Sequence, residues 1–95
     1  MCLVDGEETG VSESVEISPH TKAVAVIDNA TGTMQVQQKT AFGSSEVWIP
    51  VEDASGTTDF VDDDKVMIIE TGGEPTNFRF EITAYTSGTA RAGIA

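Results

Sequence analysis

The stretch NFRFEITAYTSGTARAGIA, residues 77–95, decides the fold of this chain. Its first half alternates apolar and polar side chains, with Phe78, Phe80 and Ile82 on the apolar side. A period of two places these three residues on one face of a β-strand, and we expect them to form the core. A turn follows, because Gly88 adopts positive φ at little steric cost. The residues after it alternate again, so the stretch predicts a hairpin of two paired strands.

Five further segments have the composition of strands, and each is bounded by Gly, Asn, Asp, Ser or Pro. They are residues 15–18, 22–28, 33–40, 46–52 and 65–70. The Asn29–Gly32 turn is of a type found in hairpins, so we expect the strands on either side of it to pair. A second turn is predicted at Phe42–Ser45. The apolar runs 23–27 and 65–70 indicate strands that are covered on both faces.

No segment shows a sustained period of 3.6, which would indicate a helix. The chain therefore predicts an all-β domain, an antiparallel β-sandwich of about seven strands and of Ig-like or jelly-roll-like type. The first 14 residues are polar, acidic and without periodicity, which predicts an extended N-terminal arm (residues 1–14) before the sandwich domain (residues 15–95).

The charge of the chain is one-sided, with 16 acidic residues against five Lys and Arg and a net charge of −11 at pH 7. This balance argues against nucleic acids and anionic membranes as partners, because phosphate groups bind basic surfaces. No run approaches the roughly 18 apolar residues of a membrane span. Cys2 is the single cysteine, so no disulfide within the chain is possible. A chain of 95 residues buries one modest core, which a partner subunit stabilises further.

The residues that carry chemistry elsewhere do not form a catalytic pattern here, and we predict neither an enzyme nor a cofactor. The single histidine, His20, follows Pro19 in a turn and is expected to be exposed. An acidic loop offers oxygen ligands of the kind that Ca²⁺ prefers, although its spacing does not match an EF-hand and a solvated loop is the alternative. The candidate calcium ligands are Asp59, Asp62, Asp63 and Asp64.

Two aromatic residues, Trp48 and Tyr85, are predicted on outward faces. Such residues stack on sugars, anchor protein contacts or cover the end of a core. The predicted partner-binding residues combine them with positions in the arm: Leu3, Val4, Glu7, Glu8, Val11, Trp48 and Tyr85.

From Gln35 onward the chain resembles small β-sandwich proteins of tailed-bacteriophage virions, of the capsid-decoration, cement or head-fibre type. Three pieces carry the resemblance: MQVQQKT (34–40), SSEVWIPVED (44–53) and FRFEITAYTSGTARAGIA (78–95). The likeness is strongest over residues 84–89. The chain departs from the pattern before the tryptophan, where Gly43-Ser44-Ser45 replaces an Asp-Gly turn.

The resemblance implies a structural role. It implies a protein made in the host cytoplasm that sits on the outer capsid surface of the virion and cements the lattice of the major capsid protein. It also implies a homo-oligomer, with a trimer favoured and a dimer possible. The alternatives are a carbohydrate- or receptor-binding module of a head or tail fibre, and a neck or tail connector.

Overall fold

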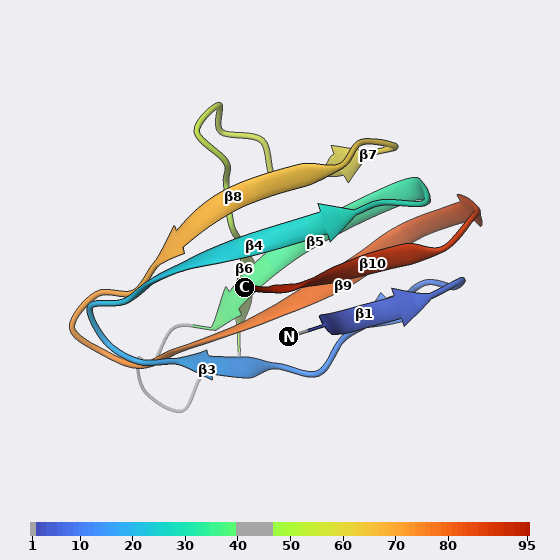
Figure 1. Cartoon of the computed structure of the whole chain (residues 1–95). Coiled ribbons are helices and arrows are strands. Elements are labelled where there is room, and N and C mark those ends of the chain that lie inside the picture. The colour runs from blue at the N-terminus through green and yellow to red at the C-terminus, as the bar shows by residue number, and fades with distance from the viewer. Residues whose placement is uncertain (1, 40–46) are drawn as a thin grey trace.

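The computed structural model describes residues 2–39 and 47–95, which form ten strands in two antiparallel sheets (Figure 1). Sheet A has the order β1-β10-β4-β8, and sheet B has the order β2-β9-β5-β6. In sheet B, β3 pairs with β9 beside β2, and β7 pairs with β5 beside β6. The strands are β1 (Cys2–Gly6), β2 (Gly10–Val11), β3 (Val15–Ile17), β4 (Lys22–Asp28), β5 (Thr31–Lys39), β6 (Trp48–Pro50), β7 (Phe60–Val61), β8 (Lys65–Glu70), β9 (Thr76–Ser87) and β10 (Ala90–Ile94). No helix long and apolar enough to cross a membrane occurs among the described residues.

The two sheets pack face to face around a single core. Phe78, Phe80 and Ile82 of β9 point into this core, as the alternation predicts. Sheet A supplies smaller side chains, such as Ala25 and Ala92, and these leave room for the phenylalanine rings of sheet B. The core comprises Val4, Ala25, Ile27, Ala30, Met34, Val36, Phe60, Met67, Ile69, Phe78, Phe80, Ile82, Ala90, Ala92 and Ile94.

Two connections that the sequence predicts as hairpins instead cross from one sheet to the other. β9 pairs with β5 in sheet B, whereas β10 lies between β1 and β4 in sheet A. β4 and β5 are separated in the same way. The predicted pairing is therefore wrong at both turns, although Gly88 does adopt a φ of +88°. A hairpin would leave two apolar faces side by side, whereas a crossing turns them toward each other, so that each covers the other.

Four such crossings lie at one end of the molecule (Figure 1). They join β1 to β2, β4 to β5, β7 to β8 and β9 to β10, and each links a strand of sheet A to the strand that occupies the same place in the order of sheet B. Hydrogen bonds connect neighbouring crossings. The N–H of Asn29 donates to the carboxylate of Asp64 (2.9 Å), and the N–H of Gly32 donates to that of Asp62 (2.7 Å). The hydroxyl of Thr89 donates to the carboxylate of Glu7 (3.1 Å).

All seven predicted strands are present, and β4 and β8 have the predicted bounds. Three additional short strands, β1, β2 and β7, raise the number to ten in the described part of the chain, so the predicted count is too low. β2 and β7 contain two residues each, too few to show an alternation. The predicted turn at Phe42–Ser45 and the predicted strand start at Glu46 lie outside the described residues.

The first residues, predicted as an arm, run extended along one edge of both sheets. β1 pairs with β10 and β2 pairs with β9, and Val4 is buried in the core. Ser12 then forms two hydrogen bonds with the backbone of Phe80, one through its N–H (2.8 Å) and one through its hydroxyl oxygen (2.9 Å). Backbone pairing orders this segment, and composition does not reveal such pairing.

We predict that Gly32→Ala lowers the free energy of unfolding by about 2 kcal/mol, because overpacking forces neighbouring backbone apart. A Cβ at Gly32 would lie 2.3 Å from the carbonyl oxygen of Ala84, where β5 is shifted in register against β9. Gly6→Ala is the matched control, since nothing lies within 4 Å of its Cβ position. Urea unfolding at pH 7 measures both, and equal losses would contradict the close approach.

Candidate docking surface

The outer face of sheet A carries four apolar side chains in two cross-strand pairs, Val24 with Ile68 and Val26 with Val66. We call these four residues the outer ladder. Val66 and Ile68 are each 66% exposed, and Val26 is 37% exposed. The prediction that both faces of these strands are covered is therefore wrong for the outer face. Two layers can bury only the faces that meet, so the second apolar face of β4 and β8 remains open to solvent.

Charged residues close both ends of the outer ladder. Lys22 and Glu70 form an ion pair of 3.6 Å at one end, and Arg91 and Asp5 form one of 3.5 Å toward the other. Such exposed pairs contribute little to stability, so their main effect is to bound the apolar area. Beside the ladder a shallow hollow lies over Gly93, which has no side chain to fill it.

A groove runs along the free edge of β8, the last strand of sheet A. It has a volume of about 490 Å³ and is lined by residues 52–54 and 65–68. Successive side chains of a strand point to opposite faces, so four consecutive residues line one groove only where it follows the strand edge. The groove is thus continuous with the outer ladder through Val66 and Ile68.

Asp53 fixes the opposite wall of this groove. Its carboxylate accepts hydrogen bonds from the N–H groups of Ser55 (2.8 Å) and Thr57 (2.9 Å) and pairs with the ammonium of Lys65 (3.0 Å). The same ammonium lies 5.8 Å from the ring centre of Phe60. The backbone bond from Thr57, followed by the Lys65 contact, lowers the pKa of Asp53.

The outer face of sheet B is polar and internally bonded at its centre, in contrast to that of sheet A, and its exposed valines, Val11 and Val61, lie at opposite edges. Arg79 donates from Nε to Gln37 (2.7 Å), and its guanidinium lies 4.2 Å from the ring centre of Trp48. The amide of Gln37 donates to Glu81 (2.7 Å). The polar groups of this face form hydrogen bonds with one another across the strands, so a partner would gain less by covering it than by covering the outer ladder.

The structure separates the arm residues that were predicted to bind partners. Leu3 packs against the core and remains half-buried, whereas Val4 is buried within the core. Glu7 accepts the hydrogen bond between crossings that is described above. Glu8 and Val11 are exposed.

Trp48 and Tyr85 do not share a surface. Trp48 and Asn77 are both paired with Lys39, on its two sides, so Trp48 lies level with Asn77 across sheet B. Tyr85 lies eight residues further along β9 than Asn77. At about 3.3 Å per residue, this separation is roughly 26 Å. The hydroxyl of Tyr85 donates to the carbonyl of Gly88 (2.7 Å) and so belongs to the crossing between β9 and β10. The two aromatic residues therefore form no joint platform for a sugar.

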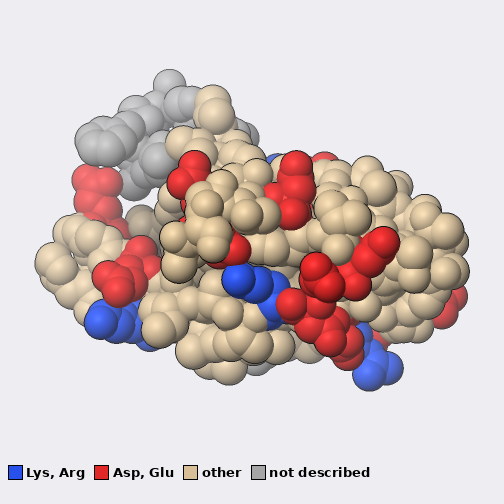
Figure 2. All heavy atoms as spheres, turned by 90° about the horizontal axis from the view of Figure 1, so that it is seen from above, with Lys and Arg blue, Asp and Glu red and all other residues tan. Residues whose placement is uncertain are grey.

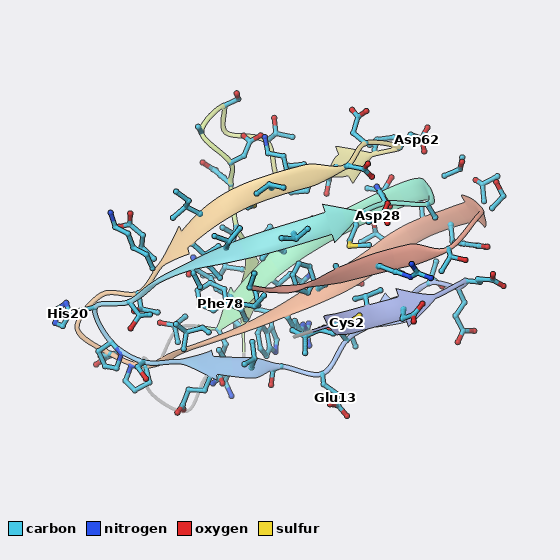
Figure 3. The ribbon with its side chains drawn as sticks, in the orientation of Figure 1. Cys2, Glu13, His20, Asp28, Asp62 and Phe78 are labelled. Carbon is cyan, nitrogen blue, oxygen red and sulfur yellow. The ribbon has the colours of Figure 1, made fainter. Side chains whose placement is uncertain are left out.

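The sequence offers four candidate calcium ligands, Asp59, Asp62, Asp63 and Asp64. Asp62 and Asp64 accept the backbone hydrogen bonds of the crossings, and Asp59 accepts one from the side chain of Gln35. Among residues 2–39 and 47–95, no group of three or more His, Cys, Asp or Glu side chains is placed to hold a metal ion. His20 is exposed in its turn, as predicted, and lies at the other end of the molecule from Asp62 (Figure 3).

The most exposed residues of this surface, Val66 and Ile68, were not among those predicted from the sequence to bind a partner. The run KVMIIE contains the signal, because two packed sheets leave the outer face of each strand uncovered and an edge strand is the most exposed. Recognising β8 as an edge strand requires the strand order, which local patterns do not contain. Comparisons with protein-family models, with curated proteins and with solved structures gave no match.

We predict that Asp64→Ala lowers the free energy of unfolding by about 1 kcal/mol, because it removes the acceptor for the N–H of Asn29. Asp63→Ala removes the same charge from an exposed neighbour and should change stability by less than about 0.5 kcal/mol. Thermal and urea unfolding of both variants make the comparison. Indistinguishable variants would show that this contact does not stabilise the crossing.

The low pKa of Asp53 predicts a pH dependence of stability. A carboxyl whose pKa is lower in the folded state stabilises the fold above its unfolded value, here 3.8, and loses this effect as the pH falls through the folded value. Asp53→Asn should therefore reduce stability at pH 7 and should flatten the decline below pH 3.8. Urea unfolding between pH 7 and pH 2 measures this difference, and parallel pH profiles of wild type and variant would refute it.

Proposed function

We propose that this protein is a structural virion protein that decorates the outside of a tailed-phage capsid and cements the lattice of the major capsid protein. The observation that carries the proposal is the outer ladder, with Val66 and Ile68 two-thirds exposed at a sheet edge. Contiguous apolar surface bounded by charged residues is typical of protein contact sites. The sequence resemblance to virion proteins supplies the identity of the assembly.

The arrangement of the sheets supports the β-sandwich of jelly-roll type within this proposal. If β2 and β3 count as one interrupted strand, and β6 and β7 as another, the two sheets have the orders 1-8-3-6 and 2-7-4-5. These are the strand orders of a jelly roll, a fold of viral capsid proteins and of lectins. A fold shared by such different proteins does not assign a function, so the surface has to decide.

The surface favours protein docking over sugar binding. A sugar site needs aromatic faces that converge, whereas Trp48 and Tyr85 lie at opposite ends of sheet B. Burial of a fully exposed Val or Ile side chain provides about 1.5–3 kcal/mol, and two-thirds of that remains available at Val66 and Ile68. Assembly on the capsid as a homo-oligomer, with a trimer favoured, is part of the proposal.

The test is cosedimentation with capsids that were assembled without this protein by the phage that encodes it. We expect the double variant V66T/I68T to bind at least about 10-fold more weakly than wild type, because a loss of 1.4 kcal/mol is tenfold in affinity. Threonine keeps the β-branched shape and the strand propensity at both positions.

Val61→Thr is the matched control, since Val61 is 55% exposed on β7 of sheet B. It should bind as wild type does. A folded V66T/I68T variant with wild-type affinity would refute docking through the outer ladder. Absence of the protein from purified virions would refute the virion role itself.

A further inference from the structure

The edges of the two sheets differ in how they are protected against the addition of another strand. Native proteins interrupt or shorten edge strands, or place bulges and prolines in them, because free backbone groups recruit foreign strands. Both edges of sheet B are broken into short pieces, β2 with β3 and β6 with β7, and Pro50 lies in β6. The β1 edge of sheet A has a register shift between Cys2 and Val4.

Within the described residues, β8 has no break, bulge or proline, and its protection is confined to Lys65 at its start, which pairs with Asp53 of the loop across the groove. Its six residues pair with β4 in unbroken register from Lys65 to Glu70, and β4 is its only strand partner in the described part of the chain. Every second residue of such a strand directs its N–H and C=O away from its neighbour. The groove beside β8 gives these groups access to a chain from outside, with room for the side chains that would point inward.

Charge decides what kind of strand fits. The side chains on the outer side of β8 are flanked by two acids, Asp64 just before the strand and Glu70 at its end. Glu52 and Asp53 lie across the groove from the strand. Acidic side chains outnumber basic ones on the side of the molecule that carries β8 (Figure 2). Lys65 pairs closely with Asp53, whereas Lys22 meets Glu70 in a long, exposed contact of 3.6 Å that contributes little, so Glu70 can still accept a closer basic side chain.

A second copy of this chain fits poorly by the same criterion. An antiparallel pair of β8 strands that aligns Val66 with Ile68 of the other copy also places Asp64 opposite Glu70 at both ends. Like charges directly opposite each other destabilise a strand pair. Each copy, moreover, carries a net charge of −11.

We propose that β8 accepts an extended basic segment of another polypeptide as an added antiparallel strand. Apolar residues of this segment lie opposite Val66 and Ile68, and Lys or Arg residues lie opposite Asp64 and Glu70. The recognised pattern is basic-x-apolar-x-apolar-x-basic, in which the x positions face the groove. Backbone bonds supply affinity and the alternate side chains supply specificity, as in other cases of strand addition. This inference rests on the proposed function as a docking protein and states the chemistry of its partner.

The test uses the full chain and three labelled peptides that are capped at both ends. The first is KTVTVTK, and the second is its charge-reversed form ETVTVTE. The third is KTVTVTK with N-methyl groups on its lysine and valine residues, whose backbone N–H groups would face β8. We expect fluorescence anisotropy to give a Kd at least tenfold lower for KTVTVTK than for either of the others. Higher salt should weaken its binding, because the charge contacts are exposed. Hydrogen exchange with bound KTVTVTK should slow at residues 65–70 and remain unchanged in β2 and β6.

A protein variant locates the site independently. I68K places a positive charge beside the lysines of the peptide and should weaken the binding of KTVTVTK at least tenfold. V61K, on sheet B, is the control and should leave the affinity unchanged. Equal binding of KTVTVTK and ETVTVTE, no measurable binding of either, or protection outside β8 would overturn the inference. A dimer in sedimentation velocity that I68K dissociates would assign the edge to a second copy instead.

The outcomes also separate this inference from the proposed function. If V66T/I68T weakens capsid binding but the protein shows no preference among the peptides, only the basic-strand partner is refuted. Selective peptide binding without capsid binding refutes only the virion role.

Discussion

The four crossings at one end of the molecule are the constraint on which the rest of the structure depends. Each crossing joins a strand of sheet A to the strand that faces it, so the path of the chain fixes which apolar faces meet. Large side chains such as Phe78 and Phe80 lie on sheet B, and small ones such as Ala25 and Ala92 complete the core from sheet A. The aspartates of the acidic loop serve this arrangement, because Asp62 and Asp64 bond the backbone of the neighbouring crossing.

This arrangement determines which surfaces are left open. A structure of two layers covers one face of each sheet, and the two outer faces differ in chemistry. On sheet B, Arg79, Gln37 and Trp48 contact one another, and the exposed valines Val11 and Val61 stand apart at its two opposite edges. On sheet A, the outer ladder remains exposed and continues over the edge of β8 into the groove. The asymmetry between the two faces is the physical basis for placing the docking surface on sheet A.

Local patterns predicted the strands well and their partners poorly. The alternation identified β9 and its buried face from Phe78 to Ile82, and the bounds of β4 and β8 were predicted to the residue. It is wrong beyond Ile82, because the register shift against β5 reverses the faces, so that Ala84 is exposed and Tyr85 packs against the core. The turns at Gly88 and Asn29 were placed correctly, but a hairpin and a crossing share the same turn residues and the same alternation. Only the pairing of strands distant in the sequence distinguishes the two. The same limit applies to the surface, since two layers leave the outer face of sheet A open and the edge position of β8 makes Val66 and Ile68 more exposed than Val26.

The most direct test of the central claim, that sheet A carries the contact surface, is an electron cryomicroscopy reconstruction of the purified particle at a resolution that separates β-strands. We expect one domain per site with the outer face of sheet A and the edge of β8 against the coat protein, and with an added strand beside β8. A reconstruction in which sheet A faces solvent while the polar face of sheet B contacts the capsid would contradict it.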